Sequence, residues 1–212
     1  MSFSFFAAMS RLKYIERWAL MRNSRAENLS EHSLEVSMLA HAIAGIGRVR
    51  YGRTASIDRA AVLAMYHDAS EIITGDLPTP VKYYSRQIKE AYREVERRAE
   101  RQLLKRLPAD LRPLYQELFF SEDSEEERYL RSVVKAADRL SAYIKCIEEE
   151  RAGNTEFRSA KQTIWEDIQE RQEQLPELRD FLRDFLPSYG RTLDELELGA
   201  QADAGEPGDA GA

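Results

Sequence analysis

The chain has 212 residues, and 43% of them are hydrophobic, which gives enough apolar surface for the core of one domain. Its formal net charge of -6 provides no general attraction to a phosphate backbone. This argues against a nucleic acid polymer as partner, although a few residues can still bind a small anion. The single cysteine, Cys146, excludes an internal disulfide and is typical of a reducing compartment, so we expect the protein in the cytoplasm.

The first segment, Phe5 to Met21, carries apolar residues at helical spacing and predicts a helix. Its start is apolar but lacks the basic region of a signal peptide. Arg11 and Lys13 also interrupt it well short of a membrane span. We therefore expect this helix to dock on the fold, and no contact with a membrane.

Two further helices are predicted in the next part of the chain. Asn28 followed by Glu31 resembles a capping box, which predicts a second helix running to about Gly47. A third helix is expected over 58–74. It should end at 75–80, Gly-Asp-Leu-Pro-Thr-Pro, because one glycine and two prolines break helical geometry.

The remaining segments repeat the same apolar spacing, and the alternation typical of strands is absent. An acidic run is expected to begin one of these helices, where the helix dipole favours negative charge. The predicted helices cover 88–107, 129–150, 157–173 and 178–186. The sequence therefore predicts an all-α fold, a single-domain helical bundle.

No internal repeat or linker justifies a second domain, so we expect one domain over 1–197. The last segment, 198–212, contains no aromatic or β-branched residue. Such a composition does not offset the entropy of ordering the chain, and we predict a disordered C-terminal tail without chemistry.

Four polar residues stand in otherwise apolar helical segments. His32 and His67 are expected to point inward, and a lone inward histidine is commonly bonded to a backbone carbonyl. Asp68 and Asp138 change that interpretation, because a carboxylate in an apolar segment needs a partner or a metal. The alternative is that both aspartates pair with arginines such as Arg139.

Together these four residues offer two imidazole nitrogens and two carboxylate oxygens, a donor set that suits Mn²⁺, Co²⁺ or Fe²⁺. A closed structural zinc site usually relies on cysteine thiolates, which are absent here. The set therefore indicates a catalytic centre with positions left for water. The remaining histidine, His41, is treated as structural.

The same residues reproduce the H…HD…D pattern of the HD-domain metal-dependent phosphohydrolases. Three longer stretches resemble the bacterial HD-domain 5′-deoxynucleotidases: RWALMRNSRAENLSEHS (17–33), MYHDASEIITGDLPTPVK (65–82) and VKAADRL (134–140). The resemblance covers nearly everything before the tail. It implies an HD-type fold and hydrolysis of a deoxyribonucleoside 5′-monophosphate to deoxyribonucleoside and phosphate. It also implies one divalent metal ion per chain, Co²⁺, Mn²⁺ or similar, and a homodimer.

The resemblance also assigns roles to catalytic residues. Glu71 follows His67 by one helical turn, so its carboxylate is expected beside the site as general acid or base. Its alternative is an ordinary surface glutamate. Arg17 matches the position that orients the phosphate, or else it only solvates the surface. Either Glu71 or Asp76 protonates the departing O5′ oxygen.

Substrate contacts are expected from the same motifs. Trp18 matches a position that packs against the sugar and crowds out a 2′-hydroxyl, and otherwise it is a core residue. The loop that begins at Asp76 matches the substrate loop, and otherwise it is a helix-terminating turn. The full predicted substrate set is Arg17, Trp18, His32, Asp68, Asp76, Leu77, Pro78, Thr79 and Asp138.

Two rival functions stay open. One is an HD hydrolase of other nucleotides, either a sugar-indifferent 5′-nucleotidase or a dNTP hydrolase, to which Arg22, Arg25 and Lys82 would contribute charge. The other is a catalytically silent HD module that binds nucleotide. The lack of further histidines argues against the second metal site of HD phosphodiesterases and favours a monoesterase.

Overall fold

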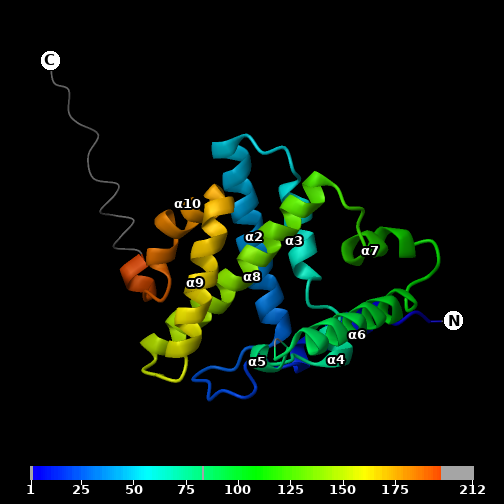
Figure 1. Cartoon of the computed structure of the whole chain (residues 1–212), viewed down its shortest axis with the longest axis horizontal. Coiled ribbons are helices and arrows are strands. Elements are labelled where there is room, and N and C mark those ends of the chain that lie inside the picture. Colours follow the sequence, from blue (N-terminus) through cyan, green and yellow to red (C-terminus); the bar gives the residue numbers. More distant parts are fainter. Residues whose placement is uncertain (1, 83, 197–212) are drawn as a thin grey trace.

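The computed structural model describes residues 2–82 and 84–196, and within them the only strand-like pairing is one isolated bridge between Glu16 and Asn28. The predicted all-α fold is confirmed. Long helices pack side by side, with α2 against α3, α8 and α10, and α8 against α3 and α9 (Figure 1). These helices are α2 (Leu29–Tyr51), α3 (Ile57–Met65), α8 (Glu125–Arg151), α9 (Arg158–Gln174) and α10 (Pro176–Asp184).

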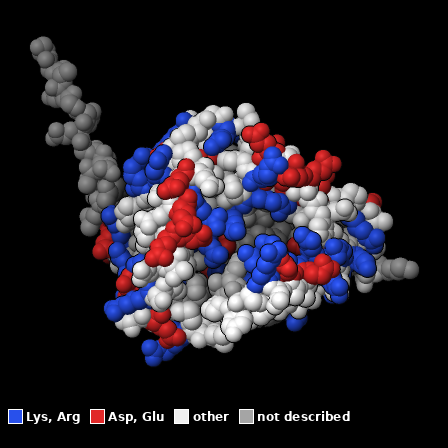
Figure 2. Space-filling view, viewed as in Figure 1, with Lys and Arg blue, Asp and Glu red and all other residues white. Residues whose placement is uncertain are grey.

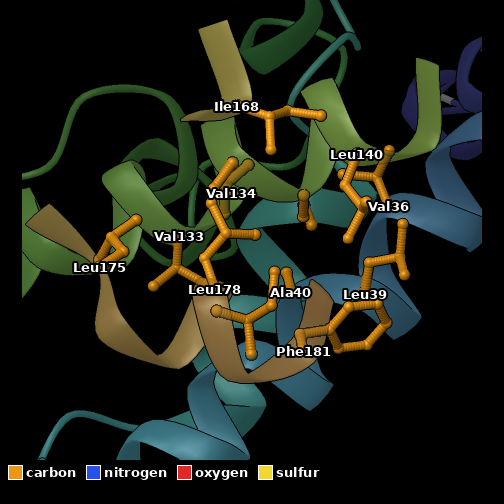
Figure 3. Close-up of a cluster of buried hydrophobic side chains, with 14 of the residues drawn as sticks. Val36, Leu39, Ala40, Val133, Val134, Leu140, Ile168, Leu175, Leu178 and Phe181 are labelled. Carbon is orange, nitrogen blue, oxygen red and sulfur yellow. The ribbon is translucent and has the colours of Figure 1, made fainter. Parts of the chain in front are cut away.

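The main core lies between these long helices. Figure 3 shows Val36, Leu39 and Ala40 of α2 facing side chains of α8, α9 and α10. Each helix contributes residues at three- and four-residue spacing, as expected for helices that bury one apolar stripe. The partners drawn from those three helices and the turn before α10 are Val133, Val134, Leu140, Ile168, Leu175, Leu178 and Phe181.

A second, smaller group of helices packs beside the first. Here α6 contacts α1, α4, α5 and α7 around a separate hydrophobic cluster that includes Phe5, Leu103 and Leu107. The segment that follows α3 joins the two cores, because Leu63 belongs to the main core and Ala69 to the second. The bounds are α1 (Phe5–Met9), α4 (Glu71–Thr74), α5 (Thr79–Lys82), α6 (Arg86–Leu104) and α7 (Arg112–Phe119).

The prediction for the first helix is wrong in its length. Helix α1 ends at Met9, a 3-10 helix covers Ser10–Tyr14, and the chain then runs extended from Ile15. Trp18 has a positive φ of 59°, a conformation that costs a bulky residue energy and does not occur inside an α-helix. The segment that carries Arg17 and Trp18 is therefore a loop.

The capping box is confirmed. The Asn28 side chain accepts hydrogen bonds from the backbone N–H groups of Ser30 (3.0 Å) and Glu31 (3.1 Å). The predicted end at Gly47 is wrong, because α2 continues to Tyr51 and ends at Gly52, whose φ of 65° suits glycine. A Cβ on Gly47 would come within 2.6 Å of the Tyr129 hydroxyl, so this glycine serves close packing instead.

The predicted third helix is two elements. Helix α3 ends at Met65, a turn covers 66–70, and α4 begins at Glu71. The break occurs at Ala64, whose carbonyl accepts hydrogen bonds from the His67 backbone N–H (3.3 Å) and the His67 ring Nδ1–H (2.6 Å). This carbonyl would accept from Asp68 in a continuous α-helix. His67 and Asp68 therefore lie in a turn.

The later helices appear within a few residues of their predicted bounds. Helix α7 was missed because it has eight residues and Pro113 in its first turn. The predicted substrate loop contains the short helix α5, and the predicted tail, 198–212, lies outside the described residues. Among the described helices, none has the length and apolar character needed to cross a membrane.

Candidate metal centre and substrate cavity

Three separate segments bring the four predicted metal ligands together. His32 comes from α2, His67 and Asp68 from the turn after α3, and Asp138 from α8. The Nε2 atom of His32 lies 3.6 Å from Asp68 Oδ2 and 3.3 Å from Asp138 Oδ1. The Nε2 atom of His67 lies 3.0 Å from Asp68 Oδ2 and 3.9 Å from Asp138 Oδ1. His32, His67 and Asp68 thus each offer a ligand atom within 4.8 Å of the others, and Asp138 lies beside both histidines.

The two Nε2 atoms that face this point are buried and have no hydrogen-bond partner among the described residues. For His67 the tautomer follows directly. Its Nδ1 carries the hydrogen donated to the Ala64 carbonyl, so in the neutral ring Nε2 presents a lone pair to the centre. Buried nitrogens without partners are rare in proteins, and a bound cation is one arrangement that satisfies them.

His32 has two neighbours at Nδ1 that have opposite effects on where the ring hydrogen lies. Arg17 Nη1 lies 2.7 Å away and can only donate, whereas the Ser141 hydroxyl lies 3.1 Å away and can accept. The Ser141 hydroxyl in turn donates to Glu35 Oε2 at 2.5 Å. In the tautomer that leaves Nε2 free for a cation, the chain through Ser141 to Glu35 supplies the acceptor for the Nδ1 hydrogen. Neither Ser141 nor Glu35 was predicted, because the residues that they bond lie more than 100 positions away in the sequence.

Charge is concentrated at the centre. Burial lowers the pKa of His67, but the adjacent Asp68 carboxylate outweighs burial and raises that pKa to about 9. Burial raises the pKa of Asp68, yet His67 brings it down to about 2, and the histidines also hold the pKa of Asp138 below its usual range. The centre therefore retains a positive charge between two carboxylates, either a proton or a metal ion.

The alternative pairing of these aspartates with Arg139 is wrong. Arg139 Nε lies 3.0 Å from Asp167 Oδ2 on α9. Arg17 is the arginine that acts electrostatically on both Asp68 and Asp138. The donor set and the two unpartnered nitrogens fit a divalent cation. The third histidine, His41, is half exposed and lies beside Asp58, away from the centre.

Glu71 is buried at the edge of this cluster. Its exposed fraction is 7%, and its Oε2 has no hydrogen-bond partner among the described residues. Burial, reinforced by Asp68 and Asp76, raises its pKa to about 9. The alternative of a solvated surface glutamate is therefore wrong. Burial favours the protonated form of Glu71, which the turn, and not helical spacing, places beside the centre.

Arg17 and Trp18 are fixed by a common acceptor. Arg17 Nη1 and Trp18 Nε1 each donate to Glu27 Oε2 at 3.1 Å. The Trp18 ring lies 5.3 Å from that of Phe157 at a tilt of 60°. Arg17 is nearly buried beside His32, so the alternative of a solvated surface arginine is wrong.

A buried ion pair holds this loop on α8. Glu149 accepts hydrogen bonds from the backbone N–H groups of Ser24 (2.8 Å) and Arg25 (3.3 Å), and from the Asn154 side chain (2.8 Å). Lys145 bonds both Glu149 and the Arg25 carbonyl. Neither residue was predicted, because both stand in a strongly charged stretch where solvated side chains are the normal expectation.

A cavity of about 490 Å³ opens beside the centre, between the loop of Trp18, the loop of Asp76 and helices α8 and α9. Arg17, Trp18, Asp76, Leu77, Pro78 and Asp138 line it, and these were all predicted. The side chain of Thr79 lies outside the part that the structure describes. Residues of α9 such as Thr163 and Ile164 also line the cavity and were missed, because helix patterns do not show which exposed face borders a cavity.

Asp76 links the two loops that form the cavity. Burial raises the pKa of its carboxyl group, while the nearby Arg17 guanidinium and the Trp18 backbone N–H lower it. Arg17 and Asp138 of the metal centre line this cavity together with apolar side chains such as Leu77 and Pro78. A ligand with an anionic end and a less polar body fits such a surface.

Comparison with known proteins shows the family to which this chain belongs. A family model described as 5′-deoxynucleotidase YfbR-like matches residues 4–189. The chain belongs to this family. The 5′-deoxynucleotidase YfbR of Escherichia coli is 47% identical over 91% of this chain and 94% of its own length. A 5′-deoxynucleotidase of Enterobacter sp. is 48% identical with the same two coverages.

Solved structures agree on the fold. An HD-domain phosphohydrolase from Listeria innocua has a TM-score of 0.75 at 23% identity, covering 95% of this chain and 96% of its own. A cyanophage S-2L HD phosphohydrolase, bound to dA and one catalytic Zn²⁺ ion, has a TM-score of 0.62 at 20% identity, covering 86% and 94%. These similarities show that this YfbR-like chain has the HD-domain fold.

Proposed function

We propose that the chain hydrolyses deoxyribonucleoside 5′-monophosphates to a deoxyribonucleoside and inorganic phosphate, with one divalent metal ion. The observation that carries the proposal is the pair of unpartnered Nε2 atoms facing two carboxylates, at one end of a cavity lined by Arg17 and Trp18. Family membership supports it, because the relatives are 5′-deoxynucleotidases.

His32, His67, Asp68 and Asp138 would hold the metal ion. When bound, such an ion offsets negative charge on the phosphate and lowers the pKa of a coordinated water from about 15.7 towards 7. The nitrogen and oxygen donors suit Mn²⁺ or Co²⁺. The Zn²⁺ ion of the cyanophage relative makes Zn²⁺ a third candidate.

The reaction needs one proton at the leaving oxygen. The oxygen of water forms a bond to phosphorus and gives up one proton, the bond between phosphorus and O5′ breaks, and O5′ takes up a proton. Glu71 supplies the proton that O5′ takes up, because it is the buried acid held in its protonated form beside the centre. The proton released by water restores the acid after each turnover. Asp76, whose pKa is also raised by burial, then bonds the substrate from the cavity wall.

Two side chains select the substrate. Arg17 directs its guanidinium towards the centre and is suited to two phosphate oxygens. Trp18 is held by Glu27 and Phe157 in a strained backbone conformation, and a ring fixed in this way can exclude a 2′-hydroxyl by shape. Homodimer formation and a cytoplasmic location remain proposals from the resemblance and the composition.

The rival dNTP hydrolase has less support. Arg22 and Arg25 are exposed and lie beside Glu156 and Glu31, and Lys82 is paired with Glu96 at 2.7 Å. None of these three basic residues lines the cavity beside the metal centre. A silent binding module is also less favoured, because Glu71 and Arg17 are both placed beside the centre.

A substrate panel tests the proposal. Metal-loaded protein would be given dAMP, AMP and dATP, and the products separated by chromatography. We expect deoxyadenosine and phosphate from dAMP, with much slower release from AMP. Release of triphosphate or pyrophosphate from dATP at a higher rate than phosphate from dAMP would overturn the proposal.

A further inference from the structure

A second cavity reaches the same metal centre from the other side of α8. It has a volume of about 220 Å³ and is lined by residues of α3, α6, α7 and α8, together with His67 of the turn. Asp138 lines both cavities, whereas Arg139 and Ala142 line only the larger one. Figure 1 shows α9 on one side of α8 and α3 with α7 on the other. The centre is therefore approached from two sides.

The second cavity suits a smaller ligand than the first. Sites for drug-sized molecules span roughly 300–1,000 Å³. The larger cavity falls in this range, and the second lies below it. The first cavity is therefore the better fit for a nucleoside, while the second has room for a small ion and a few waters.

The walls of the second cavity favour an anion. Arg131, Lys135 and Asp138 lie at spacings of four and three on α8, so they share one helix face that ends at the metal centre. Lys135 is exposed and makes no ion pair or hydrogen bond within the described part of the chain. Figure 2 shows a hollow on this side of α8 with basic side chains at its rim.

Of the other charged groups of this cavity, Arg131 has partners of its own and Glu100 is partly neutral. Arg131 donates to the Leu118 carbonyl (3.2 Å) and to Ser121 (2.9 Å), and it lies 3.1 Å from Glu127. The remaining acid, Glu100, has its pKa raised to about 7 by burial and by Glu96, so part of it is protonated near neutral pH. Lys135 is therefore the one lining cation, among the described residues, that carries no partner.

The geometry of hydrolysis gives this cavity a role. In-line displacement places the attacking oxygen opposite the leaving oxygen. If the nucleoside occupies the larger cavity, as the proposed function requires, the far side of phosphorus faces the second cavity. We propose that the second cavity is an oxyanion subsite that receives the inorganic phosphate product, with Lys135 as its principal cation. Phosphate then leaves without passing the nucleoside.

The test measures phosphate binding directly. Inorganic phosphate would be titrated by calorimetry into the Mn²⁺-loaded full chain and its Lys135→Gln and Lys135→Arg variants. A charge-assisted hydrogen bond predicts phosphate binding about tenfold weaker in Lys135→Gln. Lys135→Arg should retain most of the affinity. Lys105→Gln is the matched control, because Lys105 is also exposed and without a partner but lies at the end of α6, outside this cavity.

Kinetics separate the subsite from the substrate site. The inhibition constant for phosphate should rise in Lys135→Gln by a larger factor than KM for dAMP. Phosphate binding equal to wild type would overturn the inference, and so would a KM for dAMP that rises by the same factor as the inhibition constant. If the protein binds phosphate through Lys135 but does not hydrolyse dAMP, the proposed function fails while the subsite stands. If the protein hydrolyses dAMP but its phosphate binding does not depend on Lys135, the subsite inference fails while the proposed function stands.

Discussion

Replacing Ser141 with Ala is expected to weaken metal binding through the tautomer of His32. For Nε2 to bind a cation, the ring hydrogen must lie on Nδ1 and needs an acceptor. Within 3.5 Å of Nδ1 the structure offers the Ser141 hydroxyl and the Arg17 guanidinium, and only the hydroxyl accepts. The next acceptor, Glu27 Oε1, is 3.7 Å away.

The size of the effect follows from this geometry. Leaving a buried N–H without an acceptor costs about 1–3 kcal/mol, which corresponds to metal affinity roughly 5- to 150-fold weaker. The ring is fully buried, so water does not easily replace the hydroxyl. Titration of metal-free protein with Mn²⁺ against a competing chelator measures the affinity.

Ser33→Ala is the matched control. Ser33 is also buried, lies next to His32, and its hydroxyl has no hydrogen-bond partner among the described residues. We expect its metal affinity to match wild type. The reasoning would be refuted if Ser141→Ala bound Mn²⁺ as tightly as wild type, or if Ser33→Ala lost as much affinity.

Three further predictions concern the site and its support. Glu71→Gln should lower kcat by about 10²–10⁴-fold, because it removes the proton donor; steady-state assays with dAMP measure this, and a loss below about threefold would exclude Glu71 as the acid. Trp18→Ala should raise kcat/KM for AMP relative to dAMP by at most tens of fold, because shape alone gives modest discrimination; an unchanged ratio would remove Trp18 from sugar selection. Glu149→Gln should lower the melting temperature, because it leaves Lys145 buried without its counter-charge.

The Glu149→Gln variant should also change how the stability of the protein depends on pH. Although burial alone raises the pKa of Glu149, its hydrogen bonds to Lys145, Ser24 and Asn154 lower the folded pKa from 4.5 to about 2. A lowered folded pKa stabilises the protein above the unfolded pKa, and this contribution is lost as the pH falls from about 4.5 towards 2. Urea unfolding at several acidic pH values should therefore show a shallower pH dependence for Glu149→Gln. Equal slopes would contradict this account.

Local sequence signals predicted much of the fold. The Asn28 capping box gave the start of α2 correctly, and apolar spacing located the long helices of the core. The break after Met65 was not predictable, since the segment 58–74 has continuous helical spacing. At this break the His67 ring donates to the Ala64 carbonyl, a contact that periodicity does not report.

The candidate site was also predictable from the sequence only in part. The four metal-binding candidates were predictable because acids and histidines are unusual in apolar segments, and the structure brings all four to one centre. Their supporting residues were not predictable. Ser141, Glu35 and Glu149 act across more than 100 residues of sequence or within charged stretches, so only the tertiary structure identifies their partners.

The most direct test of the central claim is phosphate release from dAMP by chelator-stripped protein, before and after Mn²⁺ or Co²⁺ is restored, with His67→Ala alongside. The account predicts no release from stripped protein, recovery when metal is added, and no recovery for His67→Ala. Equal release with and without metal, or full recovery by His67→Ala, would contradict a catalytic metal centre at these residues.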